Sequence, residues 1–205
     1  MNERFFELPE EKQERILQAG FRVFSRSSYH QAPMNEVAAE AGISKSLLFH
    51  YFRNKREFYL YLWEICGRRT ISQMEASDCY RQADLFESMR LGMKVKMAIT
   101  RENPDMALFT LRAFYETDPD IRQDIQESCQ SLFSWKAMHM LMNLNPGQFR
   151  DGIDIRHMYR DMYLASEGYL WEAMMRNDVD FDLMEQDFEE MIGFWKSIYL
   201  RKEKK

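Results

Sequence analysis

The sequence predicts an all-α protein of about nine helices, with a small N-terminal helical domain followed by a larger helical domain. Apolar residues recur at the 3.6-residue spacing of amphipathic helices along most of the 205 residues. Only five prolines and eight glycines interrupt the chain, which leaves room for long helices. We place the domain boundary between residues 54 and 55, which gives domains of 1–54 and 55–205.

Composition limits the class of protein. Hydrophobic residues make up 45% and charged residues 30%, a balance that suits a globular core. No apolar run approaches the roughly 20 residues that span a bilayer, and the N-terminus lacks a signal-peptide pattern. We therefore expect a cytoplasmic protein with no membrane partner. The cysteines Cys66, Cys79 and Cys129 form no C-x-x-C pair, so we expect no disulfide, no metal site and no cofactor.

The N-terminal part of the chain contains the signals of four helices in close succession. The pattern predicts them at residues 10–26, at 33–41, at 45–52 and from Asn54 onward. Asn54 can cap the fourth helix, and Glu57, three residues later, can complete a capping box.

Later boundaries follow a common scheme. Asn103-Pro104-Asp105 and Asp118-Pro119-Asp120 each place a capping residue, a proline and an acid in the order typical of a helix start. The strongest loop signal runs from residue 145 to residue 154. Two final helices are expected at about 155–176 and 181–202.

Charge is unevenly distributed along the chain. The net charge is −5, yet residues 1–57 hold nine Lys/Arg and eight Asp/Glu, a net charge of +1. Residues 44–56 contain four cations and no acid. A local basic region on an acidic protein is expected where only one end of the molecule meets phosphates.

The most specific pattern lies in residues 34–55. Two short helices that cross steeply need a small residue at their closest approach, which Ala38 supplies. The turn between them needs a residue that tolerates positive φ, and Gly42 follows four residues later. Ile43 then provides an apolar side chain to fill the space between the helices.

The second of these helices has its own start signal and two distinct faces. Ser44 is a strong N-cap, and Leu48 and Phe52 form an inner apolar face. The other faces carry Lys45, Ser46, Leu47, Phe49, His50 and Tyr51. A helix of this size fits a DNA major groove, with its N-terminal residues toward the bases.

This stretch resembles the DNA-binding domain of the TetR family. The family pattern is approximately Ile-Ala-x-x-Ala-Gly-Val-Ser-x-Gly-x-Leu-Tyr-x-Tyr-Phe-x-x-Lys-x-x-Leu. This chain has Val37-Ala-Ala-Glu-Ala-Gly-Ile-Ser-Lys-Ser-Leu-Leu-Phe-His-Tyr-Phe-Arg-Asn-Lys-Arg-Glu-Phe58. The resemblance covers about residues 10–62 and implies a homodimeric repressor that binds a palindromic DNA operator and leaves it when a small-molecule effector binds.

The resemblance also assigns roles to individual residues. It implies that Lys45, Ser46, Leu47, Phe49 and His50 face the groove. It places Tyr51 and Lys55 against phosphates, and Asn35 is a further candidate for DNA contact. A cation near a helix N-terminus suits a phosphate oxygen, which supports Lys55 independently.

Four positions depart from the family pattern. Ser46 stands where glycine is common, and Phe49 stands where tyrosine is usual. Phe49 lacks a hydroxyl but can contact a thymine methyl group. Pro33 replaces the usual Ser or Thr cap, and Ser28 replaces a glycine expected before Tyr29.

The last two predicted helices have apolar faces broader than one core-facing stripe requires. One interpretation, which the resemblance also implies, is a four-helix dimer interface. The alternative is that these side chains fill the core of their own bundle. The candidate dimerisation residues are Met162, Tyr169, Phe188, Ile192, Trp195 and Tyr199.

Sixteen methionines are many for 205 residues. Because methionine adapts its shape, they are typical of a deformable apolar ligand pocket, and equally of plain core filling. Glu167 and Arg112 lie in apolar stretches, where we expect each to be solvated or paired. We assign no ligand-binding residue.

Two other classes of function compete with DNA binding. A helical enzyme would have to use His139 or His157, the latter flanked by Asp154 and Asp161 on one helix face. No Gly-rich phosphate loop or nucleophile motif supports an enzyme, so we expect no catalytic residue. A helical protein-interaction module is the other alternative, and a plain helical hairpin would explain residues 34–55 without DNA. The effector, the operator sequence and the choice between repression and activation stay open.

Overall fold

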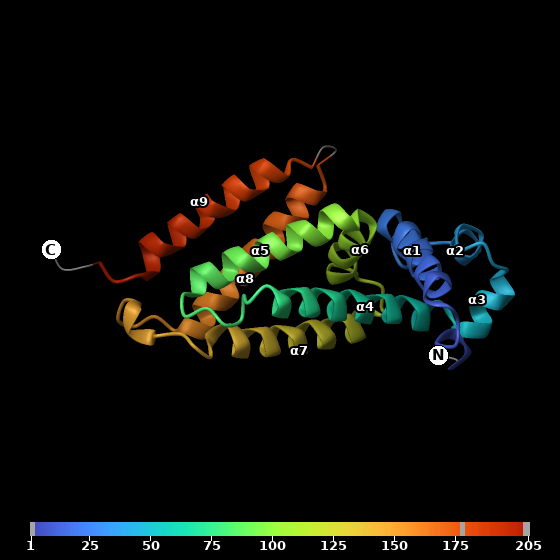
Figure 1. Ribbon diagram of the computed structural model, residues 1–205, viewed down its shortest axis with the longest axis horizontal. Helices are drawn as coiled ribbons and strands as arrows, with labels where there is room; N and C mark the ends of the chain where they lie inside the picture. Colours follow the sequence, from blue (N-terminus) through green and yellow to red (C-terminus); the bar gives the residue numbers. More distant parts are fainter. Residues whose placement is uncertain (1–2, 177–178, 203–205) are drawn as a thin grey trace. The chain divides into compact units, whose positions relative to one another are not determined.

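The computed structural model describes residues 3–176 and 179–202. Within these ranges it contains nine α-helices, two short 3₁₀ helices and no strand longer than a single bridge, so the all-α prediction is confirmed (Figure 1). The elements in chain order are η1 (Glu3–Phe5), α1 (Glu10–Arg26), α2 (Met34–Glu40), α3 (Lys45–Tyr51), α4 (Lys55–Ala76), α5 (Leu85–Glu102), α6 (Pro104–Phe114), α7 (Arg122–Leu141), η2 (Pro146–Gln148), α8 (Ile155–Met174) and α9 (Phe181–Tyr199).

The chain divides into two compact units. The first unit comprises Met1–Thr70 with Ile99–Gln130, and the second comprises Ile71–Ala98 with Ser131–Lys205. Helices α4, α5 and α7 each contribute residues to both units. This division concerns packing, and the functional boundary expected at residue 54 stays a prediction.

An aromatic cluster forms the core of the first unit. The ring of Tyr59 lies 4.9 Å from the rings of both Phe24 and Phe109, which joins α4 to α1 and α6. Gly20 lies where α1 meets α4, and a Cβ there would come within 2.7 Å of side-chain atoms of Leu62 and Phe58. The close approach of α1 and α4 therefore depends on this glycine.

The second unit buries most of the side chains expected at a dimer interface. Met162, Phe188, Ile192 and Trp195 are all at most 7% exposed in the single chain, while Tyr169 and Tyr199 are half-buried. The apolar stripe predicted for the dimer interface therefore packs mainly inside the chain's own bundle, as the alternative interpretation proposes. An apolar stripe on a helix shows that the side chains are buried but not which surface buries them.

Most helix starts agree with the sequence signals. Asn54, Asn103, Asp154 and Asp180 each accept hydrogen bonds from backbone N–H groups in the first turn of a helix. Glu57 completes the predicted capping arrangement with a variation, because its carboxylate accepts from the N–H of Arg53 rather than from that of Asn54.

One predicted start is displaced. Asp118-Pro119-Asp120 indicated a helix beginning at the proline, but α7 begins at Arg122. The carboxylate of Asp118 accepts a 3.0 Å hydrogen bond from the N–H of Asp120, and its carbonyl accepts from Ile121 and Arg122. These bonds form a turn ahead of the helix instead of its first turn.

Candidate nucleic-acid interface

The turn between α2 and α3 requires Gly42. This residue has φ +66°, a backbone conformation that costs an L-residue roughly 1–2 kcal/mol. The N–H of Gly42 donates to the carbonyl of Ala39, and the N–H of Ile43 donates to that of Ala38, both at 3.0 Å. This pair of bonds is a Schellman motif, which ends α2 sharply and sends the chain into α3.

Helix α3 is capped and anchored as the sequence indicated. The Ser44 hydroxyl accepts a 3.1 Å hydrogen bond from the N–H of Leu47. Leu48 and Phe52 are fully buried, and Ala38 on α2 is 2% exposed where the two helices approach. Ile43 is half-buried, so it fills the space between the helices less completely than expected. The buried side of α3 fixes which of its side chains can face outward.

The predicted groove residues lie on the outward side of α3. Lys45, Ser46 and His50 are exposed, and Leu47 and Phe49 are half-buried. The Ser46 hydroxyl lies 2.9 Å from that of Ser44, so the residue that replaces the common glycine is tied to the helix cap. The ammonium of Lys45 lies 5.8 Å from the centre of the Phe49 ring. Asn35, near the start of α2, is also exposed.

Sequence reasoning missed the contribution of the N-terminal segment. Phe5 is fully buried, and its ring lies 4.9 Å from that of Phe52 and 6.0 Å from that of Tyr51. This anchor places the neighbouring Arg4 beside α3, where its guanidinium donates a 3.3 Å hydrogen bond to Nε2 of His50. The available signal was the pair Phe5-Phe6, two large apolar residues in succession ahead of the first predicted helix.

The two predicted phosphate contacts have additional roles inside the protein. Tyr51 is only 8% exposed. The Lys55 ammonium donates to the carbonyls of His30 and Ala32, at 3.1 and 2.6 Å, and lies 5.2 Å from the centre of the Tyr29 ring. Burial lowers the pKa of Lys55, partly offset by Asp118. Lys55 therefore fixes the segment between α1 and α2, and phosphate contact by either residue stays a prediction.

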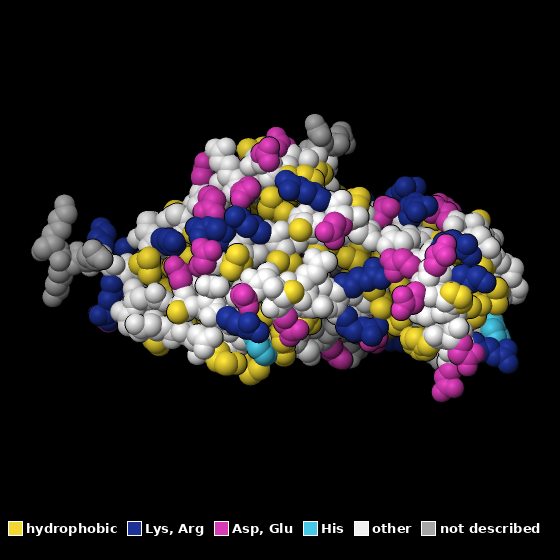
Figure 2. Space-filling view, viewed as in Figure 1, with side chains coloured by type: hydrophobic (Ala, Val, Ile, Leu, Met, Phe, Trp, Pro, Cys, Tyr) yellow, Lys and Arg dark blue, Asp and Glu magenta, His cyan; other side chains and the backbone are white. Residues whose placement is uncertain are grey.

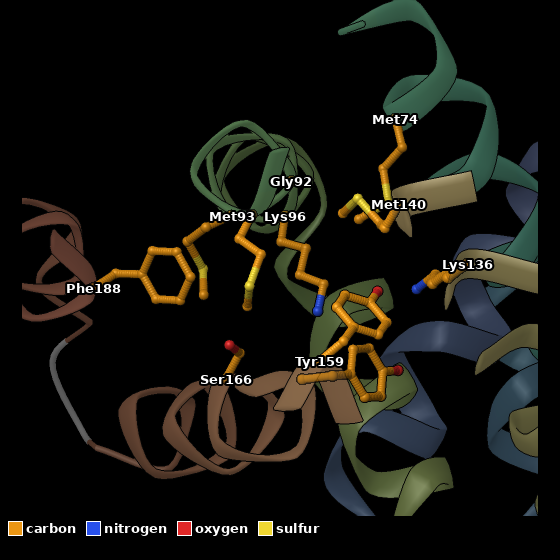
Figure 3. Close-up of a pocket in the computed structure, with 11 residues that line it drawn as sticks. Met74, Gly92, Met93, Lys96, Lys136, Met140, Tyr159, Ser166 and Phe188 are labelled. Carbon is orange, nitrogen blue, oxygen red and sulfur yellow. The ribbon is translucent and has the colours of Figure 1, made fainter. Parts of the chain in front are cut away.

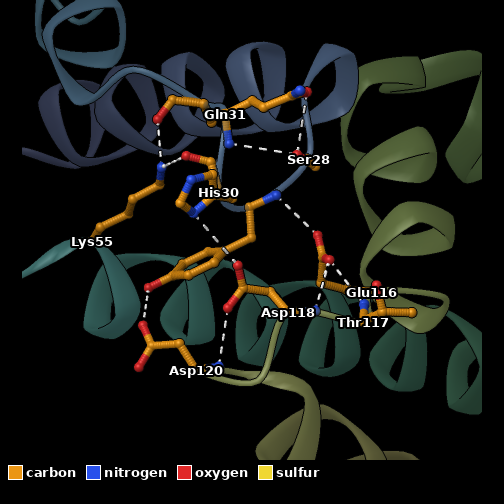
Figure 4. A network of polar contacts seen from close by, with 10 residues as sticks. Ser28, His30, Gln31, Lys55, Glu116, Thr117, Asp118 and Asp120 are labelled. Atoms are coloured by element: carbon orange, nitrogen blue, oxygen red, sulfur yellow. Dashed lines mark hydrogen bonds and ion pairs between the residues drawn. The ribbon is translucent and has the colours of Figure 1, made fainter.

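A network of polar contacts holds the same segment from its other side (Figure 4). The backbone N–H of Tyr29 donates a 2.9 Å hydrogen bond to the carboxylate of Glu116, and the Tyr29 hydroxyl donates at 2.5 Å to Asp120. Burial, followed by this bond to Asp120, raises the pKa of Tyr29 far above its ordinary value. The residues before α2 are thus bonded to the residues that precede α7.

Not all of the basic region predicted at 44–56 faces outward. Arg56 donates to the carbonyl of Asp120 at 2.9 Å and to the carboxylate of Asp124 at 2.6 Å. Lys55 is also engaged, which leaves Lys45 and Arg53 as the exposed cations of that stretch, with Arg4 added by the fold. Figure 2 shows basic and acidic side chains interspersed over the visible face of the protein.

The residues considered for an enzyme do not assemble a site. Nδ1 of His139 lies 2.8 Å from the carbonyl of Trp135, and the imidazole ring is tilted by 34° against that indole with the ring centres 4.0 Å apart. His157 is paired with Asp154, which caps α8. Over residues 3–176 and 179–202, no group of three or more His, Cys, Asp or Glu is arranged to hold a metal ion. No helix in those ranges is long and apolar enough to cross a membrane.

Comparison with known proteins supports the same assignment. Residues 16–62 match the family model described as bacterial regulatory proteins, tetR family. The fatty acid metabolism regulator protein of Bacillus subtilis (strain 168) is 22% identical over 169 residues, which covers 82% of this chain and 86% of that protein.

Solved structures share the whole fold. A TetR family transcriptional regulator from Chloroflexus aurantiacus J-10-FL superposes with a TM-score of 0.74 at 20% identity, covering 98% of this chain and 99% of the other. A transcriptional regulator from Saccharomonospora viridis, solved in complex with choline, gives a TM-score of 0.73 at 19% identity, covering 95% of this chain and 100% of that one.

A capped helix-turn-helix that matches this family model, at the N-terminus of an all-α chain, defines the class, a DNA-binding transcriptional regulator. Within that class, residues 16–62 identify a DNA-binding domain of the TetR family.

Proposed function

We propose that this protein is a cytoplasmic repressor that binds a palindromic DNA operator as a homodimer and is released by a small apolar or amphipathic ligand. The observation that carries the proposal is the capped helix α3, whose inner face is buried while Lys45, Ser46 and His50 are exposed. A helix held in this way presents a fixed set of side chains to a major groove.

The outward residues of α3 match the chemistry of base edges. Lys45 can donate to the guanine acceptors O6 and N7, and His50 can also hydrogen-bond a base edge. Phe49 offers an apolar edge to a thymine methyl group. Arg4 and Arg53 are exposed cations that suit phosphate oxygens, which position the protein without reading sequence.

A different face of α8 and α9 supports the homodimer. Leu164, Leu183 and Phe194 are 46%, 40% and 63% exposed, a large apolar area for a single chain in water. Along this outward face, apolar or small residues recur three or four positions apart on α8, namely Leu164, Gly168 and Trp171, and Met175 follows just beyond its end. On α9 the same face carries Leu183, Met191, Phe194 and Ile198. Two copies of such a helix pair suit a four-helix interface.

Relatives support control by a ligand without fixing its identity. One is named a regulator of fatty acid metabolism, and another structure was solved with choline. The first name states a regulated process and the second a bound molecule, so together they leave the ligand class of this protein open. Helices α4, α5 and α7, which run through both units, give a physical route by which a ligand in one unit could affect the other.

Selection of bound duplexes from a random DNA library tests the DNA-binding proposal. We expect enrichment of a palindrome with half-sites about one or more helical turns apart, because each protomer presents one α3. The variant Lys45→Ala should lose enrichment at particular base positions, whereas Lys94→Ala, which changes an exposed lysine in the second unit, should retain the full sequence preference. Failure of the wild-type protein to enrich any duplex would contradict the proposal.

A further inference from the structure

The second unit contains a hollow with one apolar side and one charged side (Figure 3). It is only partly enclosed, and the space of about 410 Å³ between its lining atoms includes open solvent. Its apolar lining is made by methionines and one phenylalanine: Met74, Met89, Met93, Met140 and Phe188. Flexible thioether side chains can rearrange around an alkyl chain, so this lining suits a ligand without a rigid shape.

Two lysines line the charged side. Lys96 on α5 has a side chain only 18% exposed, and Lys136 on α7 is 6% exposed as a residue. Their ammonium groups lie 5.5 and 5.6 Å from the centre of the same ring, that of Tyr163. Figure 3 shows Lys96 extending from α5 toward the tyrosine rings of α8. Lysine is among the residues least often buried, so two largely buried lysines at one hollow suggest that the hollow holds negative charge.

One carboxylate accompanies the two lysines. Glu167 accepts a hydrogen bond from Lys96 and has a side chain only 13% exposed. Burial alone would raise the pKa of Glu167, but the charges of Lys96 and Lys136 and the bond from Lys96 outweigh burial and hold it below its ordinary value. The cluster of Lys96, Lys136 and Glu167 thus combines two ammonium groups with one ionised carboxylate.

We propose that this hollow binds an amphipathic anion, with its charged head beside Lys96 and Lys136 and its apolar chain among the methionines. The inference deepens the proposed ligand control, because it names the chemical class of the ligand. Coulomb attraction is stronger in a partly buried site than in water, so an anionic head gains from the excess positive charge. A cationic head, such as a quaternary ammonium, would meet two ammonium groups and be repelled.

Calorimetry with four probes of equal chain length tests the charge preference. Decanoate, decyl phosphate, decyltrimethylammonium and decanol each contain a straight chain of ten carbons, which in decanoate includes the carboxyl carbon, and they differ in the head group. We expect at least one of the two anions to bind about tenfold or more tightly than the cation and the alcohol, the value of roughly one hydrogen bond to a charged group. The comparison of decanoate with decyl phosphate distinguishes a carboxylate from a phosphate head. Equal or tighter binding of decyltrimethylammonium or decanol would overturn the proposal.

Two substitutions shift the preference in opposite directions. Lys136→Met removes one cation and should reduce the affinity for the preferred anion about tenfold while leaving decanol binding unchanged. Glu167→Gln removes the competing carboxylate and should tighten binding of that anion. Lys94→Met is the matched control, because Lys94 lies on α5 with its side chain 54% exposed and pairs with Glu185 outside the hollow. Because Glu167→Gln predicts a gain, misfolding cannot imitate its result.

The same probes separate this proposal from the one it rests on. An anion that binds at the hollow and leaves operator affinity unchanged would uphold the anion site and overturn ligand control. Release from the operator by decanol or decyltrimethylammonium, with no release by either anion, would uphold ligand control and overturn the anion site. Loss of the anion preference in Lys136→Met, with Lys94→Met behaving as wild type, supports the assignment of the head-group position.

Discussion

The hydroxyl of Tyr29 donates a 2.5 Å hydrogen bond to the carboxylate of Asp120, although 91 residues separate them in the chain. Tyr29 lies in the segment that leads from α1 to α2, and Asp120 lies just before α7. Lys55 and Arg56, at the start of α4, bond the same two segments, Lys55 to the first and Arg56 to the second. The entrance to the helix-turn-helix is therefore fixed by long-range polar contacts as well as by its apolar core.

Removal of the Tyr29 hydroxyl should measure this connection. Tyr29→Phe is expected to lower the free energy of unfolding by about 1–3 kcal/mol, the value of a hydrogen bond to a charged group. Urea unfolding of Tyr29→Phe, Asp120→Asn and the double variant gives a coupling energy. If the two single substitutions lower the free energy of unfolding by amounts that sum to the effect of the double variant, the hydrogen bond between Tyr29 and Asp120 does not contribute to stability.

The turn between α2 and α3 predicts that replacing its glycine by alanine lowers stability, whereas the same replacement within a helix raises it. Gly42→Ala should destabilise the protein by about 1–2 kcal/mol, because Gly42 has a φ of +66°. Gly67→Ala is the matched control, since a Cβ at Gly67 on α4 meets nothing within 4 Å. That change should stabilise by about 0.5–1 kcal/mol, because alanine suits a helix interior better than glycine. Equal effects of the two substitutions on the unfolding midpoint would contradict the left-handed conformation at Gly42.

The ion pair between α1 and α4 predicts a pH dependence. Burial would raise the pKa of Glu14, but its bonds to Arg69 at 2.5 and 3.2 Å and to Gln18 at 2.7 Å lower it below the ordinary 4.5. A lowered carboxyl pKa stabilises the folded state above the unfolded-state pKa, and this contribution is lost as pH falls through the folded-state pKa.

Unfolding measured from pH 6 down to about pH 3 tests this dependence. We expect Glu14→Gln to show a smaller loss of stability than wild type over that interval, by at most about 1 kcal/mol because both side chains are partly exposed. Parallel curves for the two proteins would show that the Glu14–Arg69 pair does not stabilise the folded state.

The outward face of α8 predicts a variant that blocks dimerisation without disturbing the fold. A Cβ at Gly168 meets nothing within 4 Å, so Gly168→Arg should fold normally yet keep two copies apart. Gly193→Arg is the control, because Gly193 is equally open but lies off the apolar stripe of α9. Sedimentation should give a monomer for the first variant and a dimer for the second. A dimeric Gly168→Arg would move the interface elsewhere.

The sequence predicted local features well because local residues determine them. The start of α1 at Glu10, the Gly42 turn and the Ser44 cap depend on neighbours within about five residues. By contrast, the roles of Arg4 and Lys55 depend on partners 46 and up to 25 residues away. Spacing along one segment carries no information about such contacts.

The apolar face of α9 illustrates a second limit. The sequence predicts Phe188 and Trp195 as dimerisation residues because they lie on a regular apolar stripe, yet they are 3% and 7% exposed in the single chain. Phe194, one position from Trp195, is 63% exposed and suits a partner better. Helical periodicity identifies faces, and only the packed structure shows which face is already covered. The sequence likewise predicts that Glu167 is solvated or paired, but it does not identify Lys96 as the partner.

The most direct test of the central claim, that the outward face of α3 reads DNA, compares two duplexes with one set of variants. Affinities for the selected palindrome and for a scrambled duplex are measured across a series of salt concentrations, for wild type, Lys45→Ala, Arg53→Ala and Lys94→Ala. We predict that Lys45→Ala weakens binding to the palindrome by about 1–3 kcal/mol more than binding to the scrambled duplex. Arg53→Ala should weaken both and flatten the salt dependence by about one unit per half-site, while Lys94→Ala should match wild type. Wild-type affinity of Lys45→Ala and Arg53→Ala for both duplexes would contradict the assignment of α3 as the recognition helix.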